Sequence, residues 1–199
     1  HWYQQPTYFV FGALWYGLTS ILFFILKPTL PLQDKLSQIF EEISALLQAK
    51  ARLFDPDNKE NVEQLLFELS LQNTQVAQSL NQIRSSLLTR LKASRVSNKS
   101  IYWLNLYFFA RDIHEQATSN YLHYEHIQQN FSRSDLIFRF QKNLRLQAQA
   151  CHDLAQCILH NQQYQSSQES QIGLNHLESS LKDWIQQHPQ NFEVKNLKL

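Results

Sequence analysis

The chain has 199 residues, which is enough for one ordinary domain or for a small domain with an attachment. Its 18 basic and 17 acidic residues leave a net charge of +1, without the basic excess of a nucleic-acid-binding surface, so no nucleic-acid partner is expected. Only three glycines occur, two of them inside one apolar run. Because a β-rich fold needs glycine-bearing turns, the composition predicts an all-α protein.

The first predicted element is a transmembrane helix within residues 1–28. All residues from Tyr8 to Leu26 are uncharged, and a helix of this length covers roughly 29 Å, close to the hydrocarbon thickness of a bilayer. The run has no polar face, unlike a soluble amphipathic helix. Aromatic residues precede it and Lys27 follows it, as at a membrane interface. The alternative is a buried core helix.

Small residues on this helix predict that it packs against other membrane helices. Ala13 and Gly17 lie four residues apart, and Ser20 falls on nearly the same face. Such a stripe lets a second transmembrane helix approach closely. The sequence also lacks methionine and starts at His1. We therefore expect a piece of a longer multi-pass protein that begins at the last helix of a membrane block.

The basic residues indicate on which side of the membrane the rest of the chain lies. None precedes the apolar run. The first ones after it are Lys27, Lys35, Lys50 and Arg52. The positive-inside rule then places the polar part in the cytoplasm. The two cysteines lie six residues apart in a helical pattern, which separates them too far for a disulfide and agrees with a reducing compartment.

Residues 29–160 carry the apolar periodicity of long helices. A first stripe runs from Leu32 to Phe54 and stops at residues 55–59, where a proline forbids continuation. The next helix has a regular 4-3-4-3 spacing, typical of helices that pack lengthwise. Its seam positions are Val62, Leu66, Leu69, Asn73, Val76, Leu80, Ile83 and Leu87.

Asn73 interrupts this seam with a polar side chain. A polar seam residue can fix the register or the number of partner helices. The alternative is that Asn73 faces a buried hydroxyl or amide group on a neighbouring helix. The regular seam also motivates the expectation that the chain forms a homo-oligomer.

Two further long helices and a shorter one complete the predicted bundle. A helix opens near Ser100, and the next one begins at residues 132–135, where serines can cap it. We expect a polar linker over residues 161–171, an amphipathic helix over 172–188 and a tail over 189–199. Because long helices joined by short breaks fold back on one another, the expected architecture is a long antiparallel cytoplasmic helical bundle.

The sequence contains little that predicts chemistry. Carboxylate and imidazole side chains in two nearby segments could offer ligands to a metal ion: Asp112, His114 and Glu115, and then His123, Glu125 and His126. The alternative is an ion pair between Arg111 and Glu115, which lie four residues apart on a helix. There is no nucleophile motif, phosphate-binding loop or dinucleotide fingerprint. Neither an enzymatic activity nor a cofactor is expected.

Five short segments carry a family resemblance. They are ALWYGL within the apolar run, KARLFDP at 50–56, QNTQVAQSLNQIR at 72–84, ARDIHEQATS at 110–119 and SDLIFRFQ at 134–141. In sequence, order and spacing, the chain resembles the YccS-type, fusaric-acid-resistance-like (FUSC-like) inner-membrane proteins of Gram-negative bacteria. The likeness extends over residues 10–160, and the remaining tail looks divergent.

The resemblance implies a transport protein of the bacterial inner membrane, with two membrane blocks that are each followed by a cytoplasmic region. This chain would match the end of the first block and the region after it. Such proteins are similar to aromatic-acid efflux systems. The bundle would then serve assembly or gating. The alternative is a membrane-anchored scaffold or binding module without transport activity.

Charged and polar residues of the matching segments are candidates for structural or interface roles. Asp135 and Arg139 also have the i,i+4 spacing of an ion pair, near a helix N-terminus where an acid is favourable. The candidates are Arg52, Asp55, Asn73, Arg111, Asp112, His114, Glu115, Ser134, Asp135 and Arg139. The expected partners are the lipid bilayer, other transmembrane helices of the same parent protein and further copies of the chain.

Overall fold

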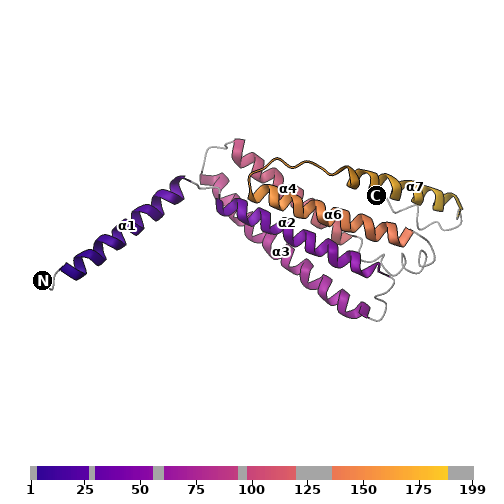
Figure 1. The fold of residues 1–199 in the computed structure, drawn as a ribbon, viewed down its shortest axis with the longest axis horizontal. Coiled ribbons are helices and arrows are strands. Elements are labelled where there is room, and N and C mark those ends of the chain that lie inside the picture. The colour runs from indigo at the N-terminus through magenta and orange to yellow at the C-terminus, as the bar shows by residue number, and fades with distance from the viewer. Residues whose placement is uncertain (1–3, 27–29, 56–60, 94–97, 120–135, 188–199) are drawn as a thin grey trace.

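The computed structural model describes residues 4–26, 30–55, 61–93, 98–119 and 136–187, and all regular structure within them is helical. The helices are α1 (Gln4–Leu26), α2 (Leu30–Leu53), α3 (Val62–Ala93), α4 (Asn98–Ser119), α6 (Leu136–Leu159) and α7 (Gln168–Gln187). Figure 1 shows α2, α3, α4, α6 and α7 gathered in one elongated bundle, while α1 extends away from it. The predicted all-α fold class is confirmed.

Helix α1 contains the apolar run, and the large apolar side chains described on it, within residues 9–20, are uncovered. The exposed fraction is 85% for Phe9, 69% for Trp15 and 76% for Tyr16. The hydroxyl of Thr19 donates a hydrogen bond to the carbonyl of Trp15 at 2.9 Å, within the same helix. Within the described part of the chain, no helix has both the length and the apolar character that crossing a membrane requires.

Helices α2 and α6 pack against each other in opposite directions through small residues. The Oγ of Ser37 donates to the carbonyl of Ala155 at 2.9 Å, and the Oγ of Ser44 donates to that of Ala148 at 2.7 Å. Positions rise by seven along α2 while they fall by seven along α6, which defines the antiparallel register. Only small side chains allow the two backbones to approach until a hydroxyl reaches the opposite main chain.

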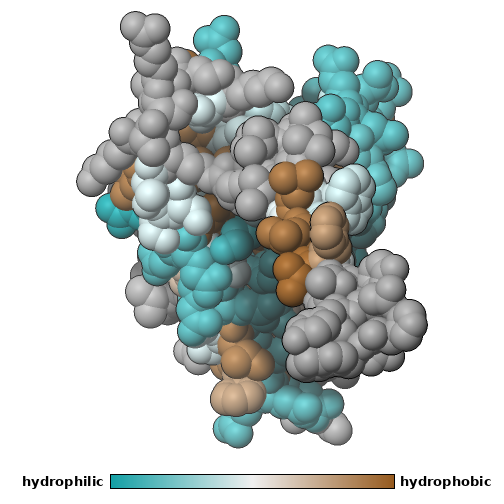
Figure 2. All heavy atoms as spheres, turned by 90° about the vertical axis from the view of Figure 1, so that its left-hand side faces the viewer, coloured by the Kyte–Doolittle hydropathy of each residue, from teal (hydrophilic) through white to brown (hydrophobic). Residues whose placement is uncertain are grey.

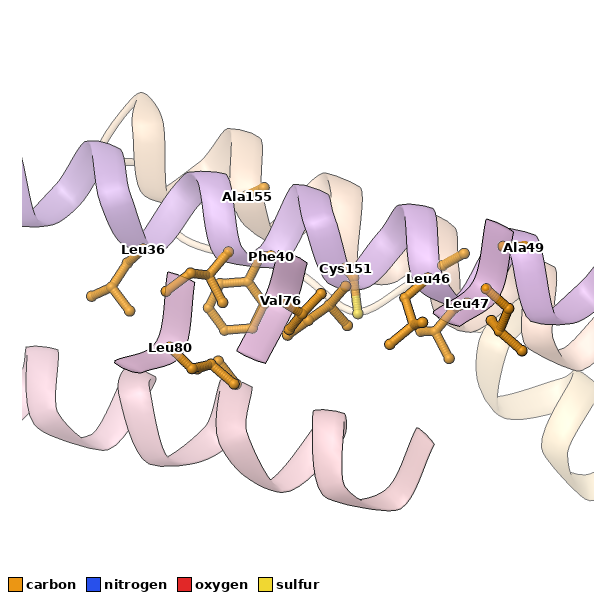
Figure 3. Packing of buried hydrophobic residues seen from close by; sticks show 14 of the residues in the cluster. Leu36, Phe40, Leu46, Leu47, Ala49, Val76, Leu80, Cys151 and Ala155 are labelled. Carbon is orange, nitrogen blue, oxygen red and sulfur yellow. The ribbon is translucent and has the colours of Figure 1, made fainter. Parts of the chain in front are cut away.

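Five of the eight seam positions of α3 are buried within the chain, and Val62, Leu66 and Asn73 are partly buried. Val76 and Ile83 have no exposed surface. Figure 3 shows Leu36 and Phe40 of α2 close to Val76 and Leu80 of α3. Because the seam already faces α2, it is not available to a second copy of the chain. The predicted homo-oligomer would need a different surface.

Helix α4 runs in the same direction as α2 and packs against both α2 and α3. The rings of Phe40 and Phe109 have centroids 6.2 Å apart, and further along both helices the Nζ of Lys50 donates to the carbonyl of Ala117 at 2.5 Å. The buried positions of α4 are Trp103, Tyr107 and Ala110. Their spacing of four and three residues places them on one helix face.

Helix α6 ends in a hydrogen-bonded turn. Asn161 has a φ of 54°, a left-handed conformation that asparagine tolerates better than most residues. Its N–H donates to the carbonyl of Ile158 at 3.2 Å, and the N–H of Gln162 donates to that of Cys157 at 2.8 Å. This Schellman pairing satisfies two carbonyl groups at the end of the helix.

Helix α7 begins four residues earlier than the predicted amphipathic helix, at Gln168, so the linker is shorter than expected. Glutamine is a good helix former, and Glu169 lies in the first turn, where a negative charge is favourable. The helix packs against α6. Leu177 is buried, and a Cβ on Gly173 would lie 2.7 Å from the Cδ1 of Leu146. Helix α7 therefore extends the bundle.

Candidate functional site

Two candidate residues, Asn73 and His114, meet where α3 faces α4. The Nε2 of His114 lies 2.8 Å from the Oδ1 of Asn73, so the ring nitrogen donates the hydrogen bond. Burial lowers the pKa of His114, although Asn73 and the charge of Glu115 act weakly in the opposite direction. The polar seam residue thus faces a partly buried imidazole of a neighbouring helix, whereas the second alternative named a buried hydroxyl or amide.

Arg52 and Asp55 connect the end of α2 to two neighbouring helices. A guanidinium nitrogen of Arg52 lies 2.6 Å from the Oε1 of Glu68 on α3. The Oδ2 of Asp55 lies 3.8 Å from a guanidinium nitrogen of Arg145 on α6. Three of these side chains are well exposed, so each pair contributes little to stability. The contacts lie between helices of the same chain.

Arg111, Asp112 and Glu115 lie on the surface of α4. The Nε of Arg111 is 3.2 Å from the Oε1 of Glu115, as the i,i+4 spacing predicted. The same guanidinium lies over the ring of Phe108, 5.3 Å from its centroid. The metal hypothesis needs inward-facing carboxylates, whereas those of Asp112 and Glu115 are exposed. Among the described residues, no three potential ligands lie close enough together to hold a metal ion.

The remaining candidate residues lie on α1, on α6 or outside the described residues. Ser134 and Asp135 lie outside the described residues, and Arg139 is exposed on α6. Ala13 and Ser20 are exposed on α1. A Cβ on Gly17 would meet nothing within 4 Å. The small-residue stripe of α1 is therefore open to another helix, as far as the described residues show.

Sequence reasoning missed a polar cluster on the edge of the α2–α6 interface. The Oε2 of Glu41 lies 2.7 Å from the Nδ1 of His152, and its Oε1 accepts a hydrogen bond from the Nε2 of Gln156 at 2.8 Å. Nearby, the Nε2 of Gln33 donates to the carbonyl of Ile158 at 2.6 Å. These contacts join residues more than a hundred positions apart, so no local sequence pattern predicts them.

A cavity of about 590 Å³ opens between α2, α4, α6 and α7. Its wall is mostly apolar and includes the side chains of Leu47, Phe54, Phe109, Phe140, Tyr164 and Leu177. The rings of Phe54 and Phe140 stack with their centroids 6.3 Å apart. Small-molecule sites in proteins have a similar volume, roughly 300–1,000 Å³, and a similar apolar lining.

Lys50 is the one charged residue among the described residues that line this cavity. Its Nζ donates to the carbonyl of Ala117, and burial lowers its pKa. No ion pair of the described residues includes Lys50. The Cys151 thiol supplies no negative charge either, because burial raises its pKa to about 11. In the sequence, Lys50 interrupts the apolar face of α2 between Leu47 and Phe54. This interruption was the sequence signal that could have indicated a charged group beside the apolar core.

These features define an all-α protein in which a long apolar helix precedes an antiparallel helical bundle with a cavity that is partly open to solvent. No solved structure matches the chain. The family whose model matches is described as the FUSC-like inner membrane protein yccS, and the match extends over residues 1–198. The chain belongs to this FUSC-like family, which confirms the resemblance predicted from its sequence.

Two relatives add to this assignment. "Inner membrane protein YccS" of Escherichia coli (strain K12) is 39% identical over 181 residues, which cover 91% of this chain and 25% of the relative. An "Uncharacterized protein" of Haemophilus influenzae is 29% identical over 163 residues, which cover 82% of this chain and 23% of the relative. The chain thus spans about a quarter of the length of the curated relatives that it matches.

Proposed function

We propose that this chain is part of an inner-membrane FUSC-like transporter, with α1 as the last helix of a membrane block and the bundle on the cytoplasmic side. The observation that carries the proposal is the uncovered apolar surface of α1, taken together with the family of the chain. Figure 2 views the molecule from the side on which α1 lies and shows brown apolar residues among teal hydrophilic ones.

The solvation of α1 supports a membrane location. Phe9, Leu14 and Trp15 point in three different directions around the helix, and each exposes about two thirds of its surface or more. Leaving large apolar side chains in water costs roughly 1.5–3 kcal/mol for each one. Lipid or neighbouring membrane helices would remove that cost. The proposed span is the whole apolar run of the sequence, including residues 21–26, whose side chains lie outside the described set.

The small-residue stripe of α1 supports a helical neighbour within the membrane. Ala13, Gly17 and Ser20 offer a shallow surface on which a second helix can approach closely. The open space around Gly17 leaves room for such a helix. We assign the neighbour to the same parent protein, because the relatives are about four times as long as this chain.

The position of α2 supports a gating role for the bundle. Helix α1 ends at Leu26 and α2 begins at Leu30. Helix α2 packs against α3, α4 and α6 at the centre of the bundle. A displacement of α1 in the membrane would therefore reach the core of the bundle through a very short connection. In the opposite direction, a change in the bundle would act on the membrane helix.

Exposed apolar side chains on the bundle support assembly of several copies. They lie on α3 and α4, outside the buried seam, and include Phe67, Leu71, Ile101 and Tyr102. Light scattering of residues 30–199 over a range of concentrations tests this part of the proposal. A complex larger than one chain supports assembly through the bundle, whereas a strict monomer at high concentration removes it.

The resemblance suggests aromatic acids as the transported molecules, and export measurements test this. The gene for the full protein is deleted, cells are loaded with a panel of aromatic acids, and their release is followed with and without a plasmid copy. We expect slower release of at least one acid in the deletion strain, restored by the plasmid. Unchanged release across the panel would favour the alternative, a membrane-anchored scaffold without transport activity.

A further inference from the structure

We propose that the cavity between α2, α4, α6 and α7 binds an amphiphilic organic anion, whose apolar body contacts the aromatic wall and whose carboxylate pairs with Lys50. This goes beyond the proposed transport function, because it places a ligand site inside the bundle and away from α1. The ligand class is an apolar ring system or acyl chain that bears a single carboxylate.

The shape and lining of the cavity determine the apolar part of the ligand. Phe109 of α4, Phe140 of α6 and Phe54, in the turn directly after α2, line one space. Tyr164 contributes from the segment between α6 and α7. An apolar body placed among these rings would be transferred from water to an apolar surface, which is the main source of affinity in such sites.

The charge of the cavity determines the polar part of the ligand. An ammonium group has three donors, and the Nζ of Lys50 uses one of them for the carbonyl of Ala117. A partly buried cation without a carboxylate partner is costly, because it has lost part of its water shell. Burial accordingly lowers the pKa of Lys50. A bound carboxylate would supply, through charge-assisted hydrogen bonds, the negative charge that no described residue gives to Lys50 in an ion pair.

A purely structural role for Lys50 is the competing explanation. Ala117 lies in the last turn of α4 (Asn98–Ser119), where carbonyl groups lack partners within the helix and attract cations. This role accounts for one of the three donors of Lys50. It does not account for a large apolar space beside the cation. The two explanations differ in whether Lys50 affects the binding of anions.

Equilibrium dialysis of the purified full chain in mild detergent tests the inference, with empty micelles as the blank. The probes are naphthoate and decanoate, which separate a ring from an acyl chain. Their neutral analogues are naphthalenemethanol and decanol. We expect saturable binding of at least one carboxylate. Its neutral analogue should bind at least about tenfold more weakly, because the charged hydrogen bond is lost.

Three variants locate the binding. Lys50→Met removes the charge, Ala150→Trp fills the cavity from α6 without changing any charge, and Lys35→Met removes an exposed lysine of the same helix as a control. We expect the first two to weaken carboxylate binding about tenfold or more, and the control to bind like the unmodified chain. Circular dichroism shows whether each variant is folded. If Lys50→Met does not fold, the binding measured with Ala150→Trp tests the inference.

The outcomes separate the explanations. Absence of saturable binding by the unmodified chain, equal binding of carboxylates and neutral analogues, or full binding by a folded Ala150→Trp variant would each overturn the inference. Binding is measured without transport across a membrane. A negative result here therefore leaves the export proposal intact, and a negative export result leaves this site intact.

Discussion

Helices α1 and α2 follow each other in the chain, have similar lengths and are both rich in large apolar residues, yet their surroundings differ completely. On α1, Phe11 exposes 75% of its surface, whereas Phe40 on α2 exposes none. The apolar residues of α2 recur with helical spacing on one face, and polar residues occupy the rest. Those of α1 surround the helix. One face can be covered by a bundle, while a helix that is apolar on all sides needs an apolar surrounding.

The largest expected effect comes from making the same substitution in both helices. Phe40→Ala should lower the free energy of unfolding by about 3–5 kcal/mol, because it leaves a cavity in the core. Phe11→Ala should change it by less than about 0.5 kcal/mol, because its ring contributes no packing to the bundle. Urea unfolding of the full chain in mild detergent, followed by circular dichroism, measures both values.

Equal losses in these two variants would contradict the comparison, because they would mean that α1 is packed as a core helix. Phe67→Ala provides a further control, since this ring lies in the bundle but is exposed on α3. It should behave like Phe11→Ala in the unfolding measurement and unlike Phe40→Ala.

The next effect sharpens the comparison at the α2–α6 contact, which has no equivalent on α1. Ala148→Leu should lower the free energy of unfolding by about 1–3 kcal/mol, because the larger side chain forces the helices apart and breaks the hydrogen bond from Ser44. The neighbouring exposed change Gln149→Leu should remain within about 0.5 kcal/mol. If the two variants were equally stable, the close approach of α2 and α6 would be disproved.

A smaller effect concerns the pH dependence of the bundle. Burial lowers the pKa of His114 in the folded chain below the ordinary histidine value of 6.5. As the pH falls, this histidine therefore binds a proton in the unfolded chain before it does so in the folded chain. Stability should therefore decrease from about pH 8 to about pH 5. His114→Gln should reduce this decrease, which is measured as the difference in unfolding free energy between the two pH values. A decrease of the same size in both proteins would exclude His114 as its source.

The smallest effect concerns the exposed ion pair of Arg52 with Glu68. Arg52→Ala should cost about 0.2–1 kcal/mol of unfolding free energy, since both side chains are open to solvent. The loss should shrink in high salt because the attraction is screened. Arg84→Ala, an exposed residue of α3 without a described ion pair, is the control. A large loss that does not depend on salt would show that Arg52 stabilises the bundle through packing instead.

Much of the fold could be predicted from the sequence because it depends on local periodicity. The apolar stripe of α2 is buried where its spacing predicted, and so is the seam of α3 from Val76 to Leu87. The pairing of α2 with α6 could not be predicted, because it joins Ser37 to Ala155 across most of the chain. The early start of α7 was missed because a polar, glutamine-rich segment is compatible with both a linker and a helix.

The candidate site was predictable only in part. The i,i+4 pair of Arg111 and Glu115 follows from helix geometry and was found. The contact of Asn73 with a neighbouring helix was one of two alternatives, but that alternative named a hydroxyl or amide, and the imidazole of His114 could not be named from the seam alone. Lys50 was counted only as a basic residue after the apolar run. Its importance depends on α4, α6 and α7 meeting beside α2, and no local pattern contains that information.

The measurement that most directly tests the difference between α1 and the bundle is extraction of bacterial membranes with alkaline carbonate. The full chain and a chain limited to residues 30–199 are expressed side by side. We expect the full chain to stay in the membrane pellet, and residues 30–199 to be released with an unchanged cooperative unfolding transition. Release of the full chain, or failure of residues 30–199 to fold without α1, would contradict the account.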